Sequence, residues 1–407
     1  MNLSIKDKLV SHWKGIALSI AALLLTVVLV MVGMAYYRAF RGIGSDYRFN
    51  LFAGEILAYT GEETTLSIPS KIAGMPVKKL GAQAFENSSL KTVTIPDSVT
   101  VIDDGCFSGC ADLTEVTLPN NLSRIGHYAF YECALSSLSL PEGVSYIGEG
   151  AFYGNQMREV SLPGSVGTLC AHTFGKCESL LSVTFSGPVS EIGEGAFAGC
   201  TALDAVSIPD GTKSIGAAAF AGCTALKSIA IPDSVQSIAC KSPADGSDGA
   251  FAGCESLLSI KLPDGIREIG ERMFYNCQSL NSVTIPDSVQ SIGREAFAMC
   301  VRLTSIRLPD SVREMDGKDY GDGRDGIFSG CVSLSDVTLS ENTANLGYKM
   351  FYGCISLKSI VVPQNVQTID KWAFLDCAAL TDVVLKNSET KIDPSAFDNC
   401  KNVQIFR

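Results

Sequence analysis

The chain has 407 residues and a formal net charge of −11, with a sequence pI of about 4.9. This excess of negative charge repels phosphate groups, so the composition argues against nucleic acid and anionic lipid as partners. The length would allow two or three ordinary domains, but it sets no such number for a repeat array, which grows by stacking similar units.

The first recognisable element is an apolar run over 16–37, and its ~22 residues are enough to cross a bilayer as a helix. Trp13 precedes the run, and Tyr36 and Tyr37 close it, as aromatic residues do at membrane interfaces. Lysines before the run and arginines after it leave a slight positive-inside bias. We therefore predict a cytoplasmic tail over 1–15 and a transmembrane signal-anchor helix over 16–37. Cleavage near 33–35 is the alternative, although the apolar core is longer than the roughly 7–15 residues of a signal peptide.

Residues 38–67 do not follow the pattern of the chain beyond them. We predict a linker and an N-terminal β cap here, because 47–54 and 55–61 resemble two short strands with glycine turns. A cap of this kind would cover the otherwise exposed core of the first repeat. No comparable cap follows the last strand pattern, which leaves a sheet edge there.

From residue 68 to residue 407 the same order of residues recurs, mostly every 23 positions. One such unit cannot bury its apolar side except against a neighbour, so the period predicts a solenoid of about fourteen repeats. The strictest marker is one phenylalanine in each repeat, which we call the column phenylalanine. These residues are Phe85, Phe107, Phe130, Phe152, Phe174, Phe197, Phe220, Phe251, Phe274, Phe297, Phe328, Phe351, Phe374 and Phe397.

The full unit is Leu-x-x-Ile-x-Leu-Pro-x-x-Val-x-x-Ile-Gly-x-x-Ala-Phe-x-x-Cys, as the stretch from Pro286 to Leu308 illustrates. This unit resembles the BspA-like class of leucine-rich repeat, a family of bacterial and protist surface proteins. The resemblance covers about residues 50–407. It implies a leucine-rich-repeat solenoid and an association with adhesion and host-protein binding, but it transfers no catalytic residues.

Within each unit we expect three segments. The Leu-x-x-Ile-x-Leu stretch predicts a strand of a concave parallel sheet, which ends at the proline because proline has no backbone donor. The Val-x-x-Ile-Gly stretch predicts a second short strand on the opposite wall, whose glycine would make a tight turn. A helical turn is then expected over Ala-Phe-x-x-Cys. The fold class is therefore a β-dominated α/β solenoid.

The 15 cysteines suggest disulfides at first, but their positions argue otherwise. Most lie three residues after a column phenylalanine, and Ser88 and Asn155 take that position in two repeats. Equivalent residues of neighbouring coils lie about 4.8 Å apart, which is slightly too far for the ~3.8 Å between the Cβ atoms of a disulfide. We expect small buried thiols that donate weakly to turn carbonyls, reduced even in an exported protein.

The sequence offers little that could carry catalysis. It has three histidines and no zinc-protease pair, phosphate loop or nucleophile elbow. Cys170, His172 and Cys177 could be imagined as a metal corner, but Cys177 belongs to the cysteine column. We predict a protein that is not an enzyme, with no catalytic residues, metal site or cofactor.

Two insertions interrupt the repeats, at 240–249 and 316–326, and each lengthens a unit from 23 to 31 residues. They enter at the same point of the repeat, three coils apart, so they should emerge on one side about 14–15 Å apart. Insertions of this kind often form the binding face of a solenoid. The second insertion combines an aromatic residue with an arginine, a pairing typical of binding hot spots. The candidate residues in the insertions are Lys241, Lys318, Tyr320 and Arg324.

The outward column of the first strand carries mainly serine and threonine. Small hydroxyl side chains lack the aromatic and arginine anchors that dominate binding energy. The column changes at Lys261 and Arg307, which flank the insertions along the chain and complete the candidate set.

These features predict an envelope-anchored, outward-facing adhesion or protein-interaction protein that binds an extracellular protein or glycan through its solenoid surface. The N-terminus would be cytoplasmic, the repeats extracellular and the single-pass helix in the cell membrane. The alternative is a structural spacer or envelope-organising protein without a specific ligand.

Overall fold

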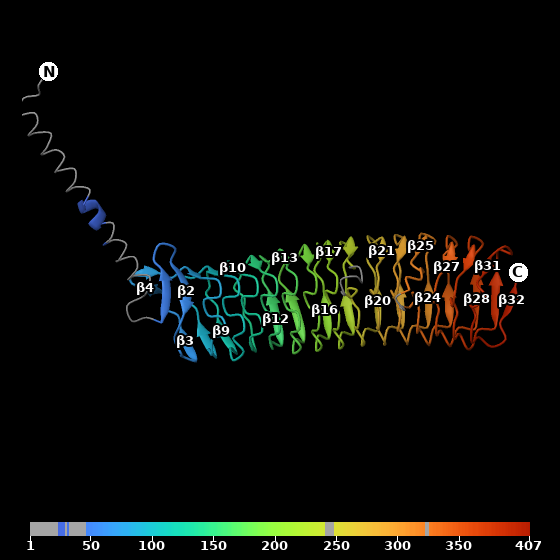
Figure 1. Cartoon of the computed structure of the whole chain (residues 1–407), viewed down its shortest axis with the longest axis horizontal. Helices are drawn as coiled ribbons and strands as arrows, with labels where there is room; N and C mark the ends of the chain where they lie inside the picture. Colours follow the sequence, from blue (N-terminus) through green and yellow to red (C-terminus); the bar gives the residue numbers. More distant parts are fainter. Residues whose placement is uncertain (1–22, 29–30, 32–45, 241–247, 322–324) are drawn as a thin grey trace, which may run out of the picture.

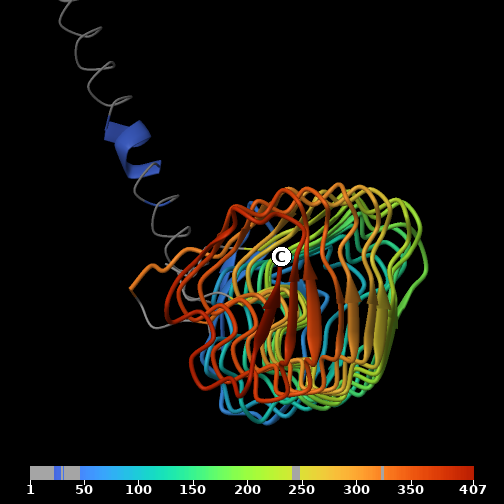
Figure 2. The same cartoon turned by 90° about the vertical axis from the view of Figure 1, so that its right-hand side faces the viewer.

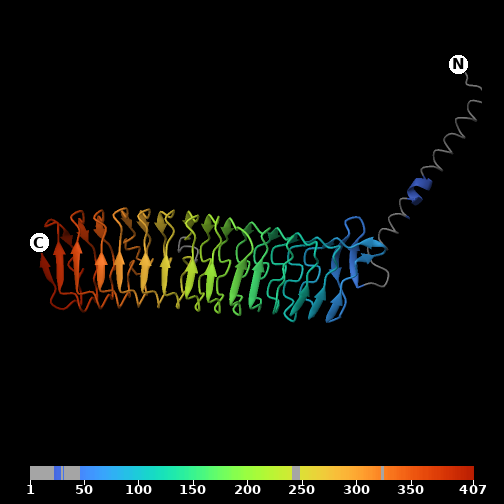
Figure 3. The ribbon, with the colours of Figure 1, turned by 180° about the vertical axis from the view of Figure 1, so that it is seen from behind.

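The computed structural model describes residues 23–28, 31, 46–240, 248–321 and 325–407. The described residues from 46 onward form one elongated stack of coils, with successive coils side by side from the N-terminal cap to the C-terminus (Figures 1 and 3). Seen end-on, each coil is a closed loop with strands on separate walls (Figure 2). The predicted leucine-rich-repeat solenoid is confirmed.

The first strand of the coils forms a parallel wall that we call the first sheet. Where strands of neighbouring coils pair, equivalent residues lie opposite each other, as Ile260 does with Val283. Alternation explains the burial, because isoleucine or valine at the middle position points inward while its neighbours face solvent. The strands are β3 (Thr65–Ser67), β7 (Thr92–Thr94), β9 (Glu115–Thr117), β12 (Glu159–Leu162), β14 (Ser182–Phe185), β16 (Ala205–Ser207), β18 (Ser228–Ala230), β20 (Ser259–Lys261), β22 (Ser282–Thr284), β24 (Ser305–Arg307), β26 (Asp336–Thr338), β28 (Ser359–Val362), β30 (Asp382–Leu385) and β32 (Gln404–Phe406).

The second strand of the coils forms another parallel wall, the second sheet. Its strands are short, and most have one buried residue, such as Ile269, and one outward residue, such as Glu268. They are β6 (Lys79–Leu80), β8 (Val101–Ile102), β10 (Arg124–Ile125), β11 (Tyr146–Ile147), β13 (Thr168–Leu169), β15 (Glu191–Ile192), β17 (Ser214–Ile215), β19 (Ser237–Ile238), β21 (Glu268–Ile269), β23 (Ser291–Ile292), β25 (Glu314–Met315), β27 (Asn345–Leu346), β29 (Thr368–Ile369) and β31 (Lys391–Ile392).

The N-terminal cap extends the second sheet by two strands. β1 (Tyr47–Asn50) pairs antiparallel with β2 (Glu55–Tyr59), and β2 pairs parallel with β6. Phe49 and Ile56 are fully buried on the first coil, and the ring of Tyr59 stacks on Phe85 at 5.3 Å. A small hairpin, β4 (Lys71–Ile72) with β5 (Met75–Pro76), accounts for the extra length of the first repeat.

The third wall contains the column phenylalanines and is built differently from the prediction. The expected helical turn is wrong: the described segment around each phenylalanine is a run of hydrogen-bonded turns. In most coils the residues two positions before and two positions after the phenylalanine have positive φ, as Glu295 (53°) and Met299 (63°) do around Phe297. A right-handed helix cannot continue through such residues. Alternate amides instead donate to the next coil, as Phe297 does to the carbonyl of Ile327 at 3.0 Å.

The repeat glycine that follows the second strand also has another role than expected. Gly216 has no positive φ, but a Cβ atom there would lie 2.5 Å from the backbone nitrogen of Glu194 in the preceding coil. The glycine therefore permits two backbones to pass in close contact rather than making a tight turn.

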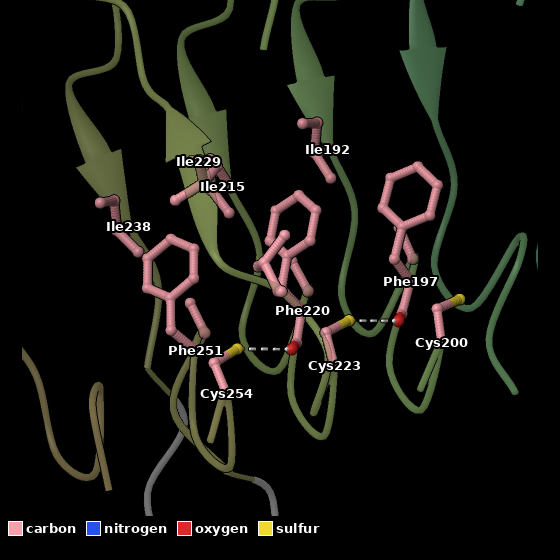
Figure 4. Packing of buried hydrophobic residues seen from close by; sticks show 14 of the residues in the cluster. Ile192, Phe197, Cys200, Ile215, Phe220, Cys223, Ile229, Ile238, Phe251 and Cys254 are labelled. Atoms are coloured by element: carbon pink, nitrogen blue, oxygen red, sulfur yellow. Dashed lines mark hydrogen bonds between the residues drawn. The ribbon is translucent and has the colours of Figure 1, made fainter. Parts of the chain in front are cut away.

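The column phenylalanines form one continuous stack inside the solenoid. Neighbouring rings are nearly parallel, as for Phe297 with Phe274 (5.4 Å, 16°) and with Phe328 (5.5 Å, 9°). Nearly all of the rings are buried, and isoleucines of the second sheet, such as Ile215, lie beside them (Figure 4). Each inner coil thus packs on both neighbouring coils through its aromatic ring. The stack is therefore a continuous contact between coils along the core.

The cysteine column is buried beside this stack, as predicted. Cys223 Sγ donates to the carbonyl oxygen of Phe197 at 3.2 Å, and Cys254 does the same to Phe220 (Figure 4). The carbonyl oxygen of Phe197 also accepts the backbone amide of Cys200 in its own coil. The thiol of Cys223 therefore occupies the second lone pair of this oxygen. Asn155, which replaces cysteine, donates Nδ2 to Phe130 in the same way at 2.7 Å.

The predicted membrane-spanning segment is described only at 23–28 and 31, which are helical. Within the described residues, no helix is both long and apolar enough to cross a bilayer. The rest of the predicted helix and the predicted cytoplasmic tail lie outside the described residues.

Candidate functional site

The two insertions leave the solenoid at equivalent points of their coils. The first begins after β19 and the second after β25, and β21 and β23 lie between these strands in the second-sheet wall. Both insertions return just before a column phenylalanine. They therefore emerge on the same side of the solenoid, as the repeat spacing predicted.

The second insertion is anchored to the neighbouring coils at both ends. The amide of Asp316 donates to Ile292 at 2.9 Å, and the carbonyl of Gly317 accepts the amide of Tyr348 at 2.7 Å. At the return, the amide of Asp325 donates to Oε1 of Glu295 at 3.1 Å. Lys349 Nζ binds the carboxylate of Asp325 at 3.0 Å. These contacts fix where the loop starts and ends.

Tyr320 is held over the coils on the N-terminal side of the insertion. Its hydroxyl donates to the carboxylate of Asp316 at 3.2 Å, and the guanidinium of Arg294 lies 4.6 Å from the ring centroid. Arg294 is itself held by Glu271, whose Oε1 accepts from Nε and Nη2 at 3.2 Å. Partial burial is the main cause of a raised pKa at Tyr320, and the negative charge of the Asp316 carboxylate raises this pKa further. The ring is thus a neutral aromatic surface, 55% exposed and fixed before any ligand arrives.

The loop and the second sheet enclose a hollow of about 670 Å³, which we call the insertion groove. A second hollow of similar volume begins beside Cys240, at the start of the first insertion, and Glu268 lines both. The side chains on the groove are of both charge signs and include an aromatic residue. They include Glu268, Glu271, Ser291, Arg313, Glu314, Asp316, Lys318, Tyr320 and Asn345.

A chain of ion pairs connects the return ends of the two insertions. Asp248, at the end of the first insertion, binds Arg272 at 2.5 Å, and Arg272 binds Glu295 at 3.5 Å. Glu295 in turn accepts the amide of Asp325 at the end of the second insertion. Side chains from consecutive coils therefore hold both return ends in register along one wall.

The structure brings together only part of the predicted site. Lys318 and Tyr320 line the insertion groove, whereas Lys241 and Arg324 lie outside the described residues. Lys261 on β20 and Arg307 on β24 are exposed on the first sheet, and Lys261 pairs there with Asp233 at 3.5 Å. These two residues flank the insertions along the chain but lie on a different wall.

Sequence reasoning missed Arg294 and Glu271. It paired Tyr320 with an arginine of the same loop, whereas the cation over its ring in the described structure comes from the coil before. Arg294 occupies a variable repeat position, and nothing in the repeat pattern shows in which direction an insertion folds.

Within the described part of the chain, no group of three or more His, Cys, Asp or Glu side chains is placed to hold a metal ion. Cys177, considered above as a metal ligand, is buried and donates to the carbonyl of Phe152 at 3.2 Å.

Comparison with known proteins gives a consistent picture of the repeats. The profile of the BspA type leucine rich repeat region matches residues 78–204, 190–242, 246–320 and 324–407. No curated protein sequence matches the chain. A solved leucine-rich repeat protein from Bacteroides ovatus is 25% identical, with 88% of this chain and 92% of that chain covered and a TM-score of 0.72.

Two further solved structures resemble the chain less closely in shape. A leucine rich cell surface protein from Faecalibacterium prausnitzii is 28% identical over 89% of this chain and 93% of that one, with a TM-score of 0.43. The pneumococcal vaccine antigen PcpA is 20% identical over 86% and 85%, with a TM-score of 0.48. The fold assignment rests on the Bacteroides ovatus protein and the repeat profile.

Proposed function

Because this chain belongs to the BspA-type leucine-rich repeat family, we propose that it is an interaction or adhesion protein of the cell envelope. It binds an extracellular protein or glycan with the insertion groove as the contact surface. Leucine-rich repeat solenoids typically mediate interactions rather than catalysis, and their binding faces are often built from per-repeat insertions.

The observation that carries this proposal is the fixed, exposed ring of Tyr320 at the edge of the insertion groove. Aromatic side chains supply much of the energy at binding interfaces. A ring that is already ordered costs less conformational entropy on binding than a mobile one. Asp316 and Arg294 supply this order, and the charged residues of both signs around the groove provide the polar rim of an interface.

The outward location rests on the sequence of the first 41 residues. We propose that 16–37 anchor the chain in the cell membrane, with 1–15 in the cytoplasm and the repeats outside. The solenoid would then project from the membrane with its groove accessible to ligands in the surroundings.

Removing the insertions should abolish binding without unfolding the coils. Deleting 240–247 and 317–324 returns both coils to the 23-residue spacing and retains Asp248 and Asp325, which bind the neighbouring coils. We expect binding to purified extracellular-matrix proteins and cell-surface glycans on an array to fall at least about tenfold. Unchanged binding by a folded deletion variant would contradict a role for the groove and favour the spacer function.

A point variant isolates the aromatic contribution in the same array. Tyr320→Ala should weaken binding by about tenfold or more, because the ring forms the anchored edge of the groove. Phe52→Ala is the matched control, since Phe52 is an exposed aromatic of the cap, remote from the groove along the array. An equal loss of binding in both variants would indicate nonspecific binding by exposed aromatic residues instead.

The proposed topology predicts that protease added to intact cells removes the repeats and leaves a membrane-bound N-terminal stub. Immunoblotting with one antibody against each end of the chain would show this. Protection of the repeats would overturn the outward orientation. A mature N-terminus at Tyr36 would overturn the anchor alone.

A further inference from the structure

A second hollow lies on the phenylalanine wall near the N-terminal end of the array. In the coil of Phe107, the positions two before and one after the phenylalanine are Gly105 and Ser108. The same positions of the next coil hold Tyr128 and Tyr131, and those of the preceding coil hold Gln83 and Glu86. Small residues between larger ones leave a space of about 560 Å³, lined by all six. We call it the tyrosine slot.

The coils on the C-terminal side support both tyrosine rings. Tyr131 stacks on Tyr153 at 5.0 Å and 9°. The ring of Tyr128 lies against Gly150, where a Cβ atom would come within 2.6 Å of the ring carbons. The two slot tyrosines are nearly perpendicular, at 81° and 5.7 Å. Two walls of an aromatic corner are therefore in place without a ligand.

The slot has an acidic character. Glu86 and Asp104 line it together with His127, and no lysine or arginine is among its lining residues. Arg124 lies 4.0 Å from Asp104 and is stacked over Tyr146. Tyr128 donates its hydroxyl to Glu149 at 2.5 Å, and this bond raises the pKa of Tyr128 to about 12. The rings remain neutral, so the negative potential comes from the carboxylates and the ring faces.

Elsewhere in the chain, equivalent tyrosines are covered by cations of the protein itself. Three other tyrosines directly follow a column phenylalanine and have such a partner: Tyr153 with Lys176 at 5.8 Å, Tyr275 with Arg272 at 4.0 Å and Tyr352 with Lys349 at 5.4 Å. Among the described residues, no cation lies over Tyr131 in this way. The slot has the aromatic faces and carboxylates of a cation site, and the cation must come from outside the chain.

We propose that the tyrosine slot binds the ammonium group of a lysine side chain presented by a partner protein. The ammonium lies against the faces of Tyr128 and Tyr131 and forms ion pairs with Glu86 and Asp104, above the floor of Gly105 and Ser108. Lysine is the occupant that matches Lys176 and Lys349, which cover equivalent rings within the chain. The inference rests on the proposed interaction function but not on the insertion groove, which is several coils away.

The test measures binding of a small probe to the full chain by ligand-observed saturation-transfer NMR. The probe is Nα-acetyl-lysine N-methylamide, and its Nε-acetylated form is the matched compound without the charge. We expect the charged probe to bind at least about tenfold more tightly, because acetylation removes both the cation–π contact and the ion pairs. Equal binding of the two probes, or no binding of either, would overturn the proposal.

Two variants locate the probe without disturbing the fold. Tyr131→Ser and Tyr128→Gly copy Ser108 and Gly105, the residues that the neighbouring coil carries at the same positions. Each should weaken binding of the charged probe by about fivefold to tenfold. Tyr275→Ser is the control, since Arg272 already covers that ring, and it should leave binding unchanged. Equal weakening in all three variants would contradict the slot.

Two more measurements fix the occupant and separate the two proposals. Choline tests a quaternary ammonium group, and tighter binding of choline than of the lysine probe would overturn the assignment to lysine. The chain lacking 240–247 and 317–324 should bind the lysine probe like the wild type, since the slot is intact there. Loss of probe binding in that variant would contradict an independent slot, whereas failure of the groove proposal alone would appear only in the array measurement.

Discussion

Replacing Phe297 by alanine is expected to lower the free energy of unfolding by about 3–5 kcal/mol. The ring is fully buried and stacks on Phe274 and Phe328 in the coils on either side. Its removal opens a cavity at two coil interfaces at once. Because a solenoid is stabilised by its nearest-neighbour interfaces, the array should unfold in two stages divided at this coil. Urea unfolding followed by circular dichroism measures both effects.

The matched control for this substitution is Phe52→Ala. Phe52 is 80% exposed on the cap, so its loss should change the stability by no more than about 0.5 kcal/mol. A Phe297→Ala variant with the wild-type unfolding curve would contradict the continuous aromatic stack as the main contact between coils.

Raising the pH from 9 toward 12 is expected to destabilise the whole array. Burial raises the pKa of most of the column thiols, to about 12 for Cys177, Cys223 and Cys277, from the ordinary value of 9.0. The unfolded chain therefore releases these protons at lower pH than the folded chain. The stabilisation is fully present below about pH 9 and is lost between about pH 9 and 12, at roughly 1.4 kcal/mol per thiol and pH unit.

Urea unfolding at a series of pH values checks this expectation. Cys223→Ser is the matched variant, because a serine hydroxyl can donate to the same carbonyl but does not titrate in this range. Its stability should fall less steeply with pH by about 1.4 kcal/mol per unit. Denatured protein without reductant should also show free thiols. Equal pH dependence in variant and wild type, or disulfides throughout the column, would contradict the buried-thiol interpretation.

Part of the candidate site could be predicted from the sequence, and part could not. The repeat spacing showed that the insertions enter at equivalent points, and the structure places the described start of each directly after a strand of the second sheet. The residues that hold Tyr320 could not be predicted in the same way. Arg294 and Glu271 are close to it only because the loop folds back over earlier coils. Tyr128 and Tyr131 were missed as well, although the same positions of the adjacent coil carry Gly105 and Ser108.

The sequence by itself determined the solenoid, the column phenylalanines and the role of the cysteine column. The reason is that burial recurs with the repeat: a residue type that returns every 23 positions faces the same surroundings in each coil. The hydrogen bond from each cysteine thiol to a turn carbonyl was also predicted, because cysteine is small and its S–H group is a weak donor.

Only the tertiary structure decided how the backbone passes the phenylalanines and what lies between coils. The positive φ values around Phe297 replace the expected helical turn, because the amides freed in this way bond to the next coil. Gly216 is required by the close approach of two backbones and not by its own φ. The turns around the phenylalanines, the close approach at Gly216 and the tyrosine slot all depend on contacts between residues more than 20 positions apart. The stacking of complete coils sets the register and separation of these residues.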